Sequence, residues 1–197
     1  MKVGHLQVVQ SPYQEQDLKI LQLNPNQAIE VIMDTYGDEI KRLIFTYVKN
    51  TSDTDDVTQE VFVTIYRKLG TFQGRSSLKS WLYSIAINKS KDYLRSWQNR
   101  NSRLKEKLSL FSKTVNTDSD TPEDVAVKQN ESNQLLKQVL SLPIKYREVL
   151  VLHYFKELST KEVGDALHIK EATVRTRLTR GRELLKTILE ERGVNNG

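Results

Sequence analysis

One group of side chains has the types and spacing needed to bind nucleic acid along a single helix. Four polar or basic residues recur at steps of four, three and four residues and so share one side of a helix: Ser84, Asn88, Lys91 and Arg95. Lysine and arginine neutralise phosphates, and asparagine can hydrogen bond to a base edge. The pattern therefore predicts a DNA-binding stripe, and the alternative interpretation is an ordinary solvated helix face.

The segment just before this stripe could hold an unstacked base. It reads Phe72-Gln73-Gly74-Arg75-Ser76-Ser77 and combines an aromatic ring, a glycine, a cation and two small hydroxyls. A pocket for a flipped base needs a stacking surface and polar groups that reach the base edge. We therefore include Phe72, Arg75, Ser76 and Ser77 in the candidate site, although an ordinary connecting loop would also have this composition.

A second candidate DNA site lies near the C-terminus and has the pattern of a helix-turn-helix. Ser159-Thr160-Lys161-Glu162 matches a capping box at the start of one short helix. After a turn at His168-Ile169-Lys170 a second helix places Val174, Leu178, Gly181 and Leu185 on one side. The candidate DNA contacts lie in the turn, on the side of the second helix opposite its apolar side, or at the edges of that opposite side. They are Lys170, Thr173, Arg175, Thr176, Arg177, Thr179, Arg180 and Arg182. The arginine clustering favours a recognition helix over a basic surface hairpin.

An acidic cluster stands apart from both basic groups and indicates a different partner. Residues 51–60 contain Asp53, Asp55, Asp56 and Glu60 and no basic residue. Carboxylates can bind hard metal ions or act as general acids and bases, so an enzyme is one alternative. No His or Cys joins the cluster, and negative charge near a helix N-terminus is stabilised by the helix dipole. We predict a protein-docking surface here, and neither a catalytic residue, a metal site nor a cofactor.

Composition limits the remaining function classes. The 197-residue chain has a formal net charge of +5 and no cysteine, which excludes disulfides and thiolate metal sites and is compatible with a reducing cytoplasm. Charge is uneven: residues 70–105 hold eight Lys or Arg and one acid, and residues 170–186 hold six Lys or Arg and two acids. Apolar runs are short and the first 16 residues lack a signal-peptide pattern, so we expect a cytoplasmic protein without membrane insertion.

Apolar periodicity predicts an all-α protein with two small lobes and a flexible linker. In the first lobe, one helix is expected to end near Asn50, and a second to run from a cap at Asp53 or Thr54 to Leu69. A third is expected to run from Leu78 to Trp97. In the second, four helices are expected within residues 135–191, and no segment alternates like a strand. Residues 114–124 are rich in Ser, Thr, Asp and Asn and contain Pro122. We divide the chain into an arm (1–25), a first domain (26–97), a linker (98–130), a second domain (131–192) and a tail (193–197).

Two long motifs, taken in order, resemble a known family. Residues 55–62, 72–77 and 81–88 resemble sigma domain 2, and residues 142–149 followed by 158–178 resemble sigma domain 4. Together they are similar to the extracytoplasmic-function (ECF, group IV) sigma factors of bacterial RNA polymerase. The resemblance covers the chain from about Ala28 to Glu191. Lys170-Glu171-Ala172 departs from the more common Ser-x-Gly start of the recognition helix, and Gly164 stands where Ala is frequent.

The resemblance implies partners and roles for the candidate residues. Asp55, Asp56, Gln59 and Glu60 would dock on the clamp helices of the largest subunit of core RNA polymerase. The 72–77 loop and Asn88 would capture a flipped base of the −10 promoter element, with Lys91 and Arg95 on its backbone, and the second helix of the helix-turn-helix would read the −35 element. The second domain would meet the flap of the second large subunit, and an anti-sigma factor would restrain the protein until a stress signal arrives. No small-molecule substrate is implied.

Two other function classes stay open from the residues alone. A free-standing helix-turn-helix regulator would bind duplex DNA tightly without polymerase, while its first lobe senses a signal or dimerises. An enzyme that uses the acidic cluster would bind a divalent metal ion through Asp56 and Glu60.

Overall fold

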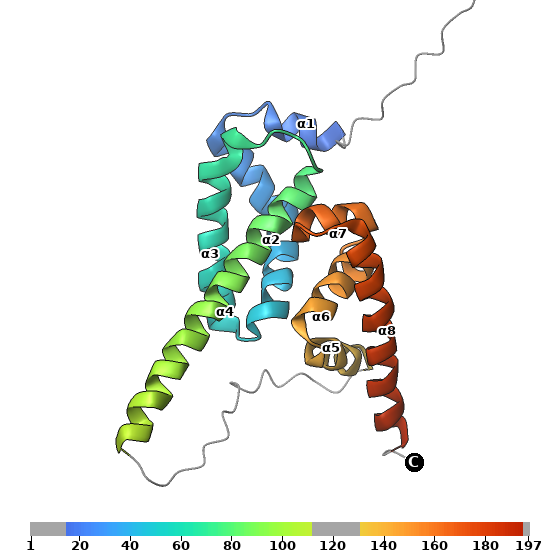
Figure 1. Cartoon of the computed structure of the whole chain (residues 1–197). Coiled ribbons are helices and arrows are strands. Elements are labelled where there is room, and N and C mark those ends of the chain that lie inside the picture. Colours follow the sequence, from blue (N-terminus) through green and yellow to red (C-terminus); the bar gives the residue numbers. More distant parts are fainter. Residues whose placement is uncertain (1–14, 112–130, 195–197) are drawn as a thin grey trace, which may run out of the picture.

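The computed structural model describes residues 15–111 and 131–194, and every regular element in these ranges is helical (Figure 1). The N-terminal lobe contains α1 (Glu15–Leu21), α2 (Pro25–Val48), α3 (Thr51–Lys68), the 3₁₀ turn η1 (Leu69–Thr71) and α4 (Leu78–Phe111). The C-terminal lobe contains α5 (Glu131–Ser141), α6 (Ile144–Leu150), the π-helical turn η2 (Val151–Phe155), α7 (Thr160–Leu167) and α8 (Glu171–Val194). The predicted all-α, two-lobed fold is confirmed. Most of the predicted arm and linker, and the end of the chain, lie outside the described residues.

The core of the N-terminal lobe follows the apolar repeat of α2. The repeat places one side of this helix against α3 and α4, and its most buried members are Ile32, Ile40, Leu43 and Ile44, each at 0% exposure. Val61 and Ile65 of α3 and Leu78 and Leu82 of α4 complete the contact. Burying side chains of this size stabilises each by about 1.5–3 kcal/mol relative to the exposed state, so this packing fixes where α3 and α4 lie.

One asparagine sets the start of α3 and, with it, the position of the acidic cluster. The Asn50 side chain accepts a hydrogen bond from the Asp53 backbone N–H at 3.0 Å, and Lys49 before it adopts the left-handed conformation (φ 60°) that ends α2. The predicted cap at Asp53 or Thr54 is therefore wrong, because Asn50 already supplies the capping oxygen. The helix begins at Thr51, and the aspartates lie in its first two turns, where the helix dipole favours negative charge.

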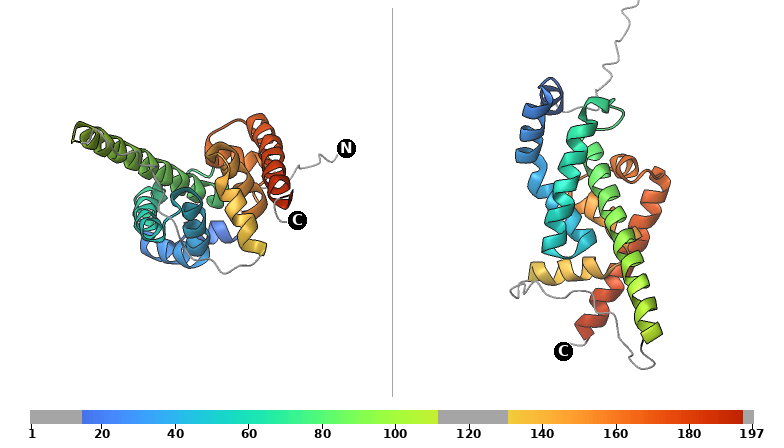
Figure 2. Two further views of the ribbon diagram at one scale, coloured as in Figure 1. Left: turned by 90° about the horizontal axis from the view of Figure 1, so that it is seen from below. Right: turned by 90° about the vertical axis from the view of Figure 1, so that its left-hand side faces the viewer.

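Helix α4 is longer than its apolar pattern predicts. It continues to Phe111 instead of ending at Trp97, so it extends into the segment predicted as linker. Residues 98–111 contain no Gly or Pro and are rich in Lys, Arg and Leu, which favour helix by intrinsic propensity. The end of α4 extends away from both lobes, as Figure 2 shows most clearly in its left view.

The helix-turn-helix of the C-terminal lobe is built as predicted, with one tight turn. Ser159 and Glu162 form both halves of the capping box, and His168 closes α7 in the left-handed conformation (φ 54°). The Ile169 backbone N–H donates to the Gly164 carbonyl at 3.0 Å, and a Cβ at position 164 would lie 2.8 Å from the Ile169 carbonyl oxygen. Glycine at 164 therefore permits this turn, where an alanine would approach the backbone too closely.

The two lobes are in contact along α4 and α7 (Figures 1 and 2). The Ser77 hydroxyl donates to the Glu162 carboxylate at 3.2 Å, and the Tyr47 hydroxyl donates to Glu148 at 3.3 Å. Tyr83 and Ile87 of α4 are also buried, and the Tyr83 hydroxyl donates to Glu39 of α2.

Candidate nucleic-acid interface and polymerase-binding surface

The loop before α4 presents its polar groups beside an aromatic pair. The Phe72 ring packs on Trp81 with centroids 5.1 Å apart and an interplanar angle of 49°. Gly74 has a φ of 65°, a left-handed conformation that glycine adopts without strain, and Arg75 is exposed. Ser77 caps α4, because its hydroxyl accepts from the Ser80 backbone N–H at 3.2 Å. The loop can therefore place a base against Phe72 with hydroxyl and guanidinium groups nearby.

The predicted polar stripe of α4 is shorter than the sequence suggested. Asn88 and Arg95 are exposed and Lys91 is half-buried, so these three share an accessible side. Ser84 is 7% exposed and its hydroxyl donates to the Trp81 carbonyl at 2.7 Å, so it is removed from the stripe. A helical wheel gives the angle of Ser84 on α4, but not the burial of the first turns of this helix.

Helix α8 separates its apolar and polar sides as predicted. Val174 and Leu178 are buried, and Gly181 lies against Leu150 of α6, where a Cβ would be 3.1 Å from a Leu150 methyl. The exposed polar residues on this part of the helix are Arg175, Thr176, Thr179, Arg180 and Arg182, with Lys170 exposed just before the helix and Thr173 half-buried. This side has the small hydroxyls and arginines that reading a major groove requires.

Two arginines near this surface are paired with glutamates. Arg175 pairs with Glu171 one turn earlier at 2.6 Å, and both side chains are largely exposed. Arg177 pairs with Glu148 of α6 at 3.0 Å and retains 26% side-chain exposure. An exposed pair contributes about 0–1 kcal/mol, so Arg175 can exchange its partner for a phosphate more easily than Arg177 can.

The acidic surface of α3 is continuous with exposed apolar residues. Asp56, Gln59 and Glu60 are exposed, and Val63 and Tyr66 follow them along the helix at 49% and 45% exposure. Lysines of neighbouring helices partly neutralise its edges: Lys41 lies 2.6 Å from Asp55, and Lys89 lies 3.4 Å from Glu60. Sequence reasoning missed the apolar part, which the four-residue spacing from Gln59 to Val63 could have indicated.

A buried carboxylate between the lobes was also missed. Glu148 has 4% side-chain exposure, and its two oxygens bind Lys91 of α4 at 2.8 Å and Arg177 of α8 at 3.0 Å. Burial, together with the adjacent Glu148 charge, raises the pKa of Tyr47 well above its usual value, so the Tyr47 hydroxyl stays a neutral donor to this carboxylate. A lysine and an arginine that we assigned to two different DNA surfaces thus meet at one side chain.

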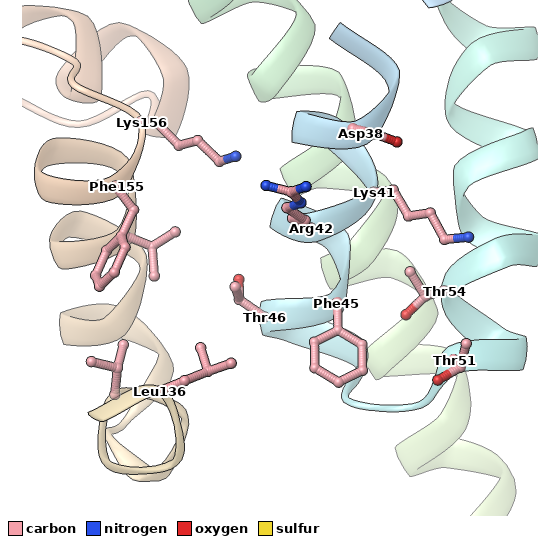
Figure 3. Close-up of a pocket in the computed structure, with 12 residues that line it drawn as sticks. Asp38, Lys41, Arg42, Phe45, Thr46, Thr51, Thr54, Leu136, Phe155 and Lys156 are labelled. Atoms are coloured by element: carbon pink, nitrogen blue, oxygen red, sulfur yellow. The ribbon is translucent and has the colours of Figure 1, made fainter. Parts of the chain in front are cut away.

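A groove of about 510 Å³ lies between the lobes (Figure 3). Its apolar lining includes Phe45 of α2 and Phe155 of η2, and Arg42 and Lys156 face each other across it (Figure 3). Burial lowers the pKa of Lys156, with the Glu39 carboxylate acting in the opposite direction. The groove thus combines apolar walls with positive charge.

Nothing in the described residues supports metal chemistry at the acidic cluster. Among residues 15–111 and 131–194, no three His, Cys, Asp or Glu side chains are grouped so that they could hold a metal ion. His153 bonds to the Leu158 carbonyl oxygen through Nδ1 at 2.7 Å, and His168 forms the α7 cap, so both have structural roles.

The helices of residues 15–111 and 131–194 lack the apolar length that crossing a bilayer requires.

Comparison with known proteins identifies the family. Residues 32–100 match sigma-70 region 2, and residues 132–185 match sigma-70 region 4. The chain is 34% identical to the ECF RNA polymerase sigma factor SigW of Bacillus subtilis (strain 168) over 179 residues. The aligned residues make up 88% of this chain and 95% of SigW. The chain belongs to the ECF sigma factors of the sigma-70 family. It is thus a transcription initiation factor and not an enzyme, and the predicted resemblance is confirmed.

Other relatives of this sigma factor agree in sequence or in fold. The ECF sigma-E factor of Escherichia coli (strain K12) is 27% identical over 170 residues, with 84% of this chain and 88% of that protein covered. CnrH, solved in complex with the cytosolic domain of CnrY, has a TM-score of 0.63 at 22% identity over 89% of this chain and 95% of its own. RpoE from Bartonella quintana, solved in complex with the anti-sigma factor NepR, has a TM-score of 0.62 at 17% identity. The comparison covers 82% of this chain and 96% of the RpoE chain. The last two share the fold of this sigma factor.

Proposed function

We propose that this sigma factor binds core RNA polymerase through the exposed side of α3, captures a −10 base at the start of α4, and reads the −35 element with α8. The observation that carries the proposal is the separation of one acidic surface from two basic ones on different helices. Since DNA selects positive charge and basic polymerase segments select negative charge, the three surfaces suit three different contacts.

At the −10 element, the N-terminal lobe would trap a base that has left the stack. The Phe72–Trp81 pair offers an aromatic surface, and exposed Asn88 offers an amide for the base edge. Arg95 and Lys91 would then hold the phosphates on either side. Unstacking a base costs a few kcal/mol per step, so capture of the flipped base would shift the melting equilibrium towards open DNA.

At the −35 element, α8 would lie in the major groove of intact duplex. Thr176 and Thr179 donate to backbone carbonyls one turn earlier, at 3.0 and 3.2 Å, which holds their side chains close to the helix and lets it approach the bases. Arg175, Arg180 and Arg182 are long enough to reach base edges or phosphates around them. We assign Arg177 a smaller part, because it is already bound to Glu148.

Polymerase contacts would come from both lobes. Asp55, Asp56, Gln59 and Glu60 would face the clamp helices of the largest subunit, and Val63 and Tyr66 would add apolar area beside these charges. We infer that the C-terminal lobe meets the flap of the second large subunit.

We further infer that an anti-sigma factor controls the protein. Structural relatives include complexes with CnrY and with the anti-sigma factor NepR. In this chain the groove between the lobes offers Phe45, Phe155 and Leu136 for an apolar helix face and Lys41, Arg42 and Lys156 for its acidic residues. A segment bound there would contact both lobes at once and oppose their separation.

Binding to core RNA polymerase from the bacterium that encodes the chain tests the polymerase-binding assignment. Asp56→Lys should weaken association about tenfold, or roughly 1.4 kcal/mol, because it reverses an exposed charge within the contact. Glu183→Lys makes the same charge change on an exposed position of α8 and serves as the control. Equal affinities for Asp56→Lys and the unmodified chain would remove α3 from the interface.

A further inference from the structure

Glu148 links the two proposed DNA surfaces through one buried side chain. Its partners Tyr47 and Lys91 belong to the N-terminal lobe, whereas Arg177 belongs to its own lobe. Lys91 lies in the α4 stripe and Arg177 on α8, so one carboxylate binds a cation from each surface. A DNA phosphate would bind these cations through the same kind of charge-assisted hydrogen bond.

The contact can open without leaving an unpaired charge in an apolar core. If the lobes separate, Glu148 loses Lys91 and Tyr47 but keeps Arg177, which moves with it. The carboxylate gains water from the side that the N-terminal lobe now covers, so the desolvation penalty of a buried single charge is avoided. Lys91 already has 35% side-chain exposure, so water can replace Glu148 as its partner when the lobes separate. The arrangement therefore suits a reversible contact.

A second polar contact holds the base-capture loop in the same closed arrangement. Ser77, in the loop that we assign to the −10 base, donates to Glu162 of α7 at 3.2 Å. Glu162 is at the same time the capping-box residue of the helix-turn-helix. The loop of the proposed −10 site is therefore bonded to the first helix of the helix-turn-helix across the lobe contact.

We propose that Glu148 is an internal competitor for DNA phosphate, which holds the free chain closed by binding Lys91 and Arg177 until the lobes separate. The closure depends only on the contacts described above. The competition rests on the proposed function, because that function assigns the two cations to DNA.

The distance between the lobes tests the closure in the absence of polymerase and DNA. The chain has no cysteine, so single cysteines at exposed Lys68 of α3 and Glu183 of α8 allow two spin labels to be placed and their separation measured. We expect one narrow distance distribution for the otherwise unmodified chain. Lys91→Ala and Glu148→Gln should each shift it to longer, broader distances, and the double variant should shift it no further, because both break the same contact.

Lys89→Ala is the matched control for this measurement. Lys89 lies on α4 two residues before Lys91 but pairs with Glu60 inside the N-terminal lobe, so its removal should leave the distances unchanged. Unchanged distances in Lys91→Ala would overturn the closure. This variant keeps the Glu148–Arg177 pair, so it decides the question even where Glu148→Gln unfolds the C-terminal lobe.

Binding of the free chain to a duplex of unrelated sequence tests the competition. If Glu148→Gln frees two cations, the slope of log K against log salt should become steeper by up to about 2, since each neutralised phosphate contributes about 0.9. Longer lobe distances with an unchanged salt slope would overturn the competition and keep the closure. Failure of the proposed function would appear instead as loss of core-polymerase binding, which neither measurement uses.

Discussion

Single cations of this sigma factor differ in how strongly the protein itself holds them. Arg95 pairs with Asp92 and Arg175 with Glu171 in exposed pairs, which contribute little and are screened by salt. Lys91 and Arg177 share buried Glu148. The exposed pairs leave Arg95 and Arg175 available to a DNA phosphate. The Glu148 carboxylate, in contrast, would compete with phosphate for Lys91 and Arg177. Asn88 carries no charge, and its exposed amide is suited to the edge of a base.

We predict that Asn88→Ala impairs promoter opening more than the first binding of the holoenzyme. Removing the amide leaves the cations in place, so closed-complex affinity should change less than twofold, whereas the open-complex fraction should fall about tenfold, as expected for one lost base contact of 1–3 kcal/mol. Permanganate reactivity of unpaired thymines measures opening. Gln98→Ala, at an exposed position farther along α4, is the control. Equal losses in binding and opening would reject the base-capture role.

A glycine in the helix-turn-helix gives a second prediction at this scale. Gly164→Ala should lower the free energy of unfolding by about 1–3 kcal/mol, the usual cost of overpacking, because the new Cβ would lie 2.8 Å from a backbone oxygen that cannot rotate away. Denaturant unfolding followed by circular dichroism measures it. An unchanged midpoint would show that the α7–α8 turn relaxes freely.

Among the elements, α7 links helix capping to the lobe contact through Glu162. Burial raises the pKa of Glu162, but hydrogen bonds from the Ser159 backbone and hydroxyl and from Ser77 lower it more, so the pKa lies below its ordinary 4.5. An unfolded chain therefore takes up this proton at higher pH than the folded chain does. The stability that Glu162 contributes is present above pH 4.5 and is lost as the pH falls through the lowered pKa.

We predict that Glu162→Gln makes the acid limb of the stability curve shallower below pH 5. Glutamine can still complete a capping box, so the fold at neutral pH should persist with a modest loss of stability. Unfolding midpoints measured between pH 3 and 7 test this, with Glu183→Gln on exposed α8 as the control. A slope identical to that of the unmodified chain would show that the Glu162 carboxylate is not the group that loses its bonds.

The elements also show what apolar periodicity can and cannot predict. It predicted the helices and the apolar side of α8 because those depend on local spacing. It failed at Asn50, where a capping oxygen outside the apolar repeat decided the helix start, and at the end of α4, where helix-favouring residues continue beyond the apolar repeat. Ser84 was predicted to be accessible, but it is buried and its hydroxyl bonds to the Trp81 carbonyl, which a helical wheel does not show.

For the whole molecule, the sequence indicates which residue types could form a site but not how the two lobes arrange them. The residues that we propose for DNA and polymerase contacts have types and spacings that are visible in the chain, and the resemblance to sigma domains ordered them. Glu148 was not predicted, since its partners Tyr47 and Lys91 lie in the other lobe, far away in sequence. Contacts between lobes depend on how two surfaces meet, and no local pattern encodes that.

Run-off transcription with purified core polymerase, across promoter fragments of the encoding genome, tests the central claim most directly. We expect transcripts that start at discrete positions only when chain and core enzyme are both present. These transcripts should weaken in Arg175→Ala and persist in Lys186→Ala, farther along α8. An unchanged transcript pattern on adding the chain, or tight promoter binding by the chain with no contribution from polymerase, would contradict it.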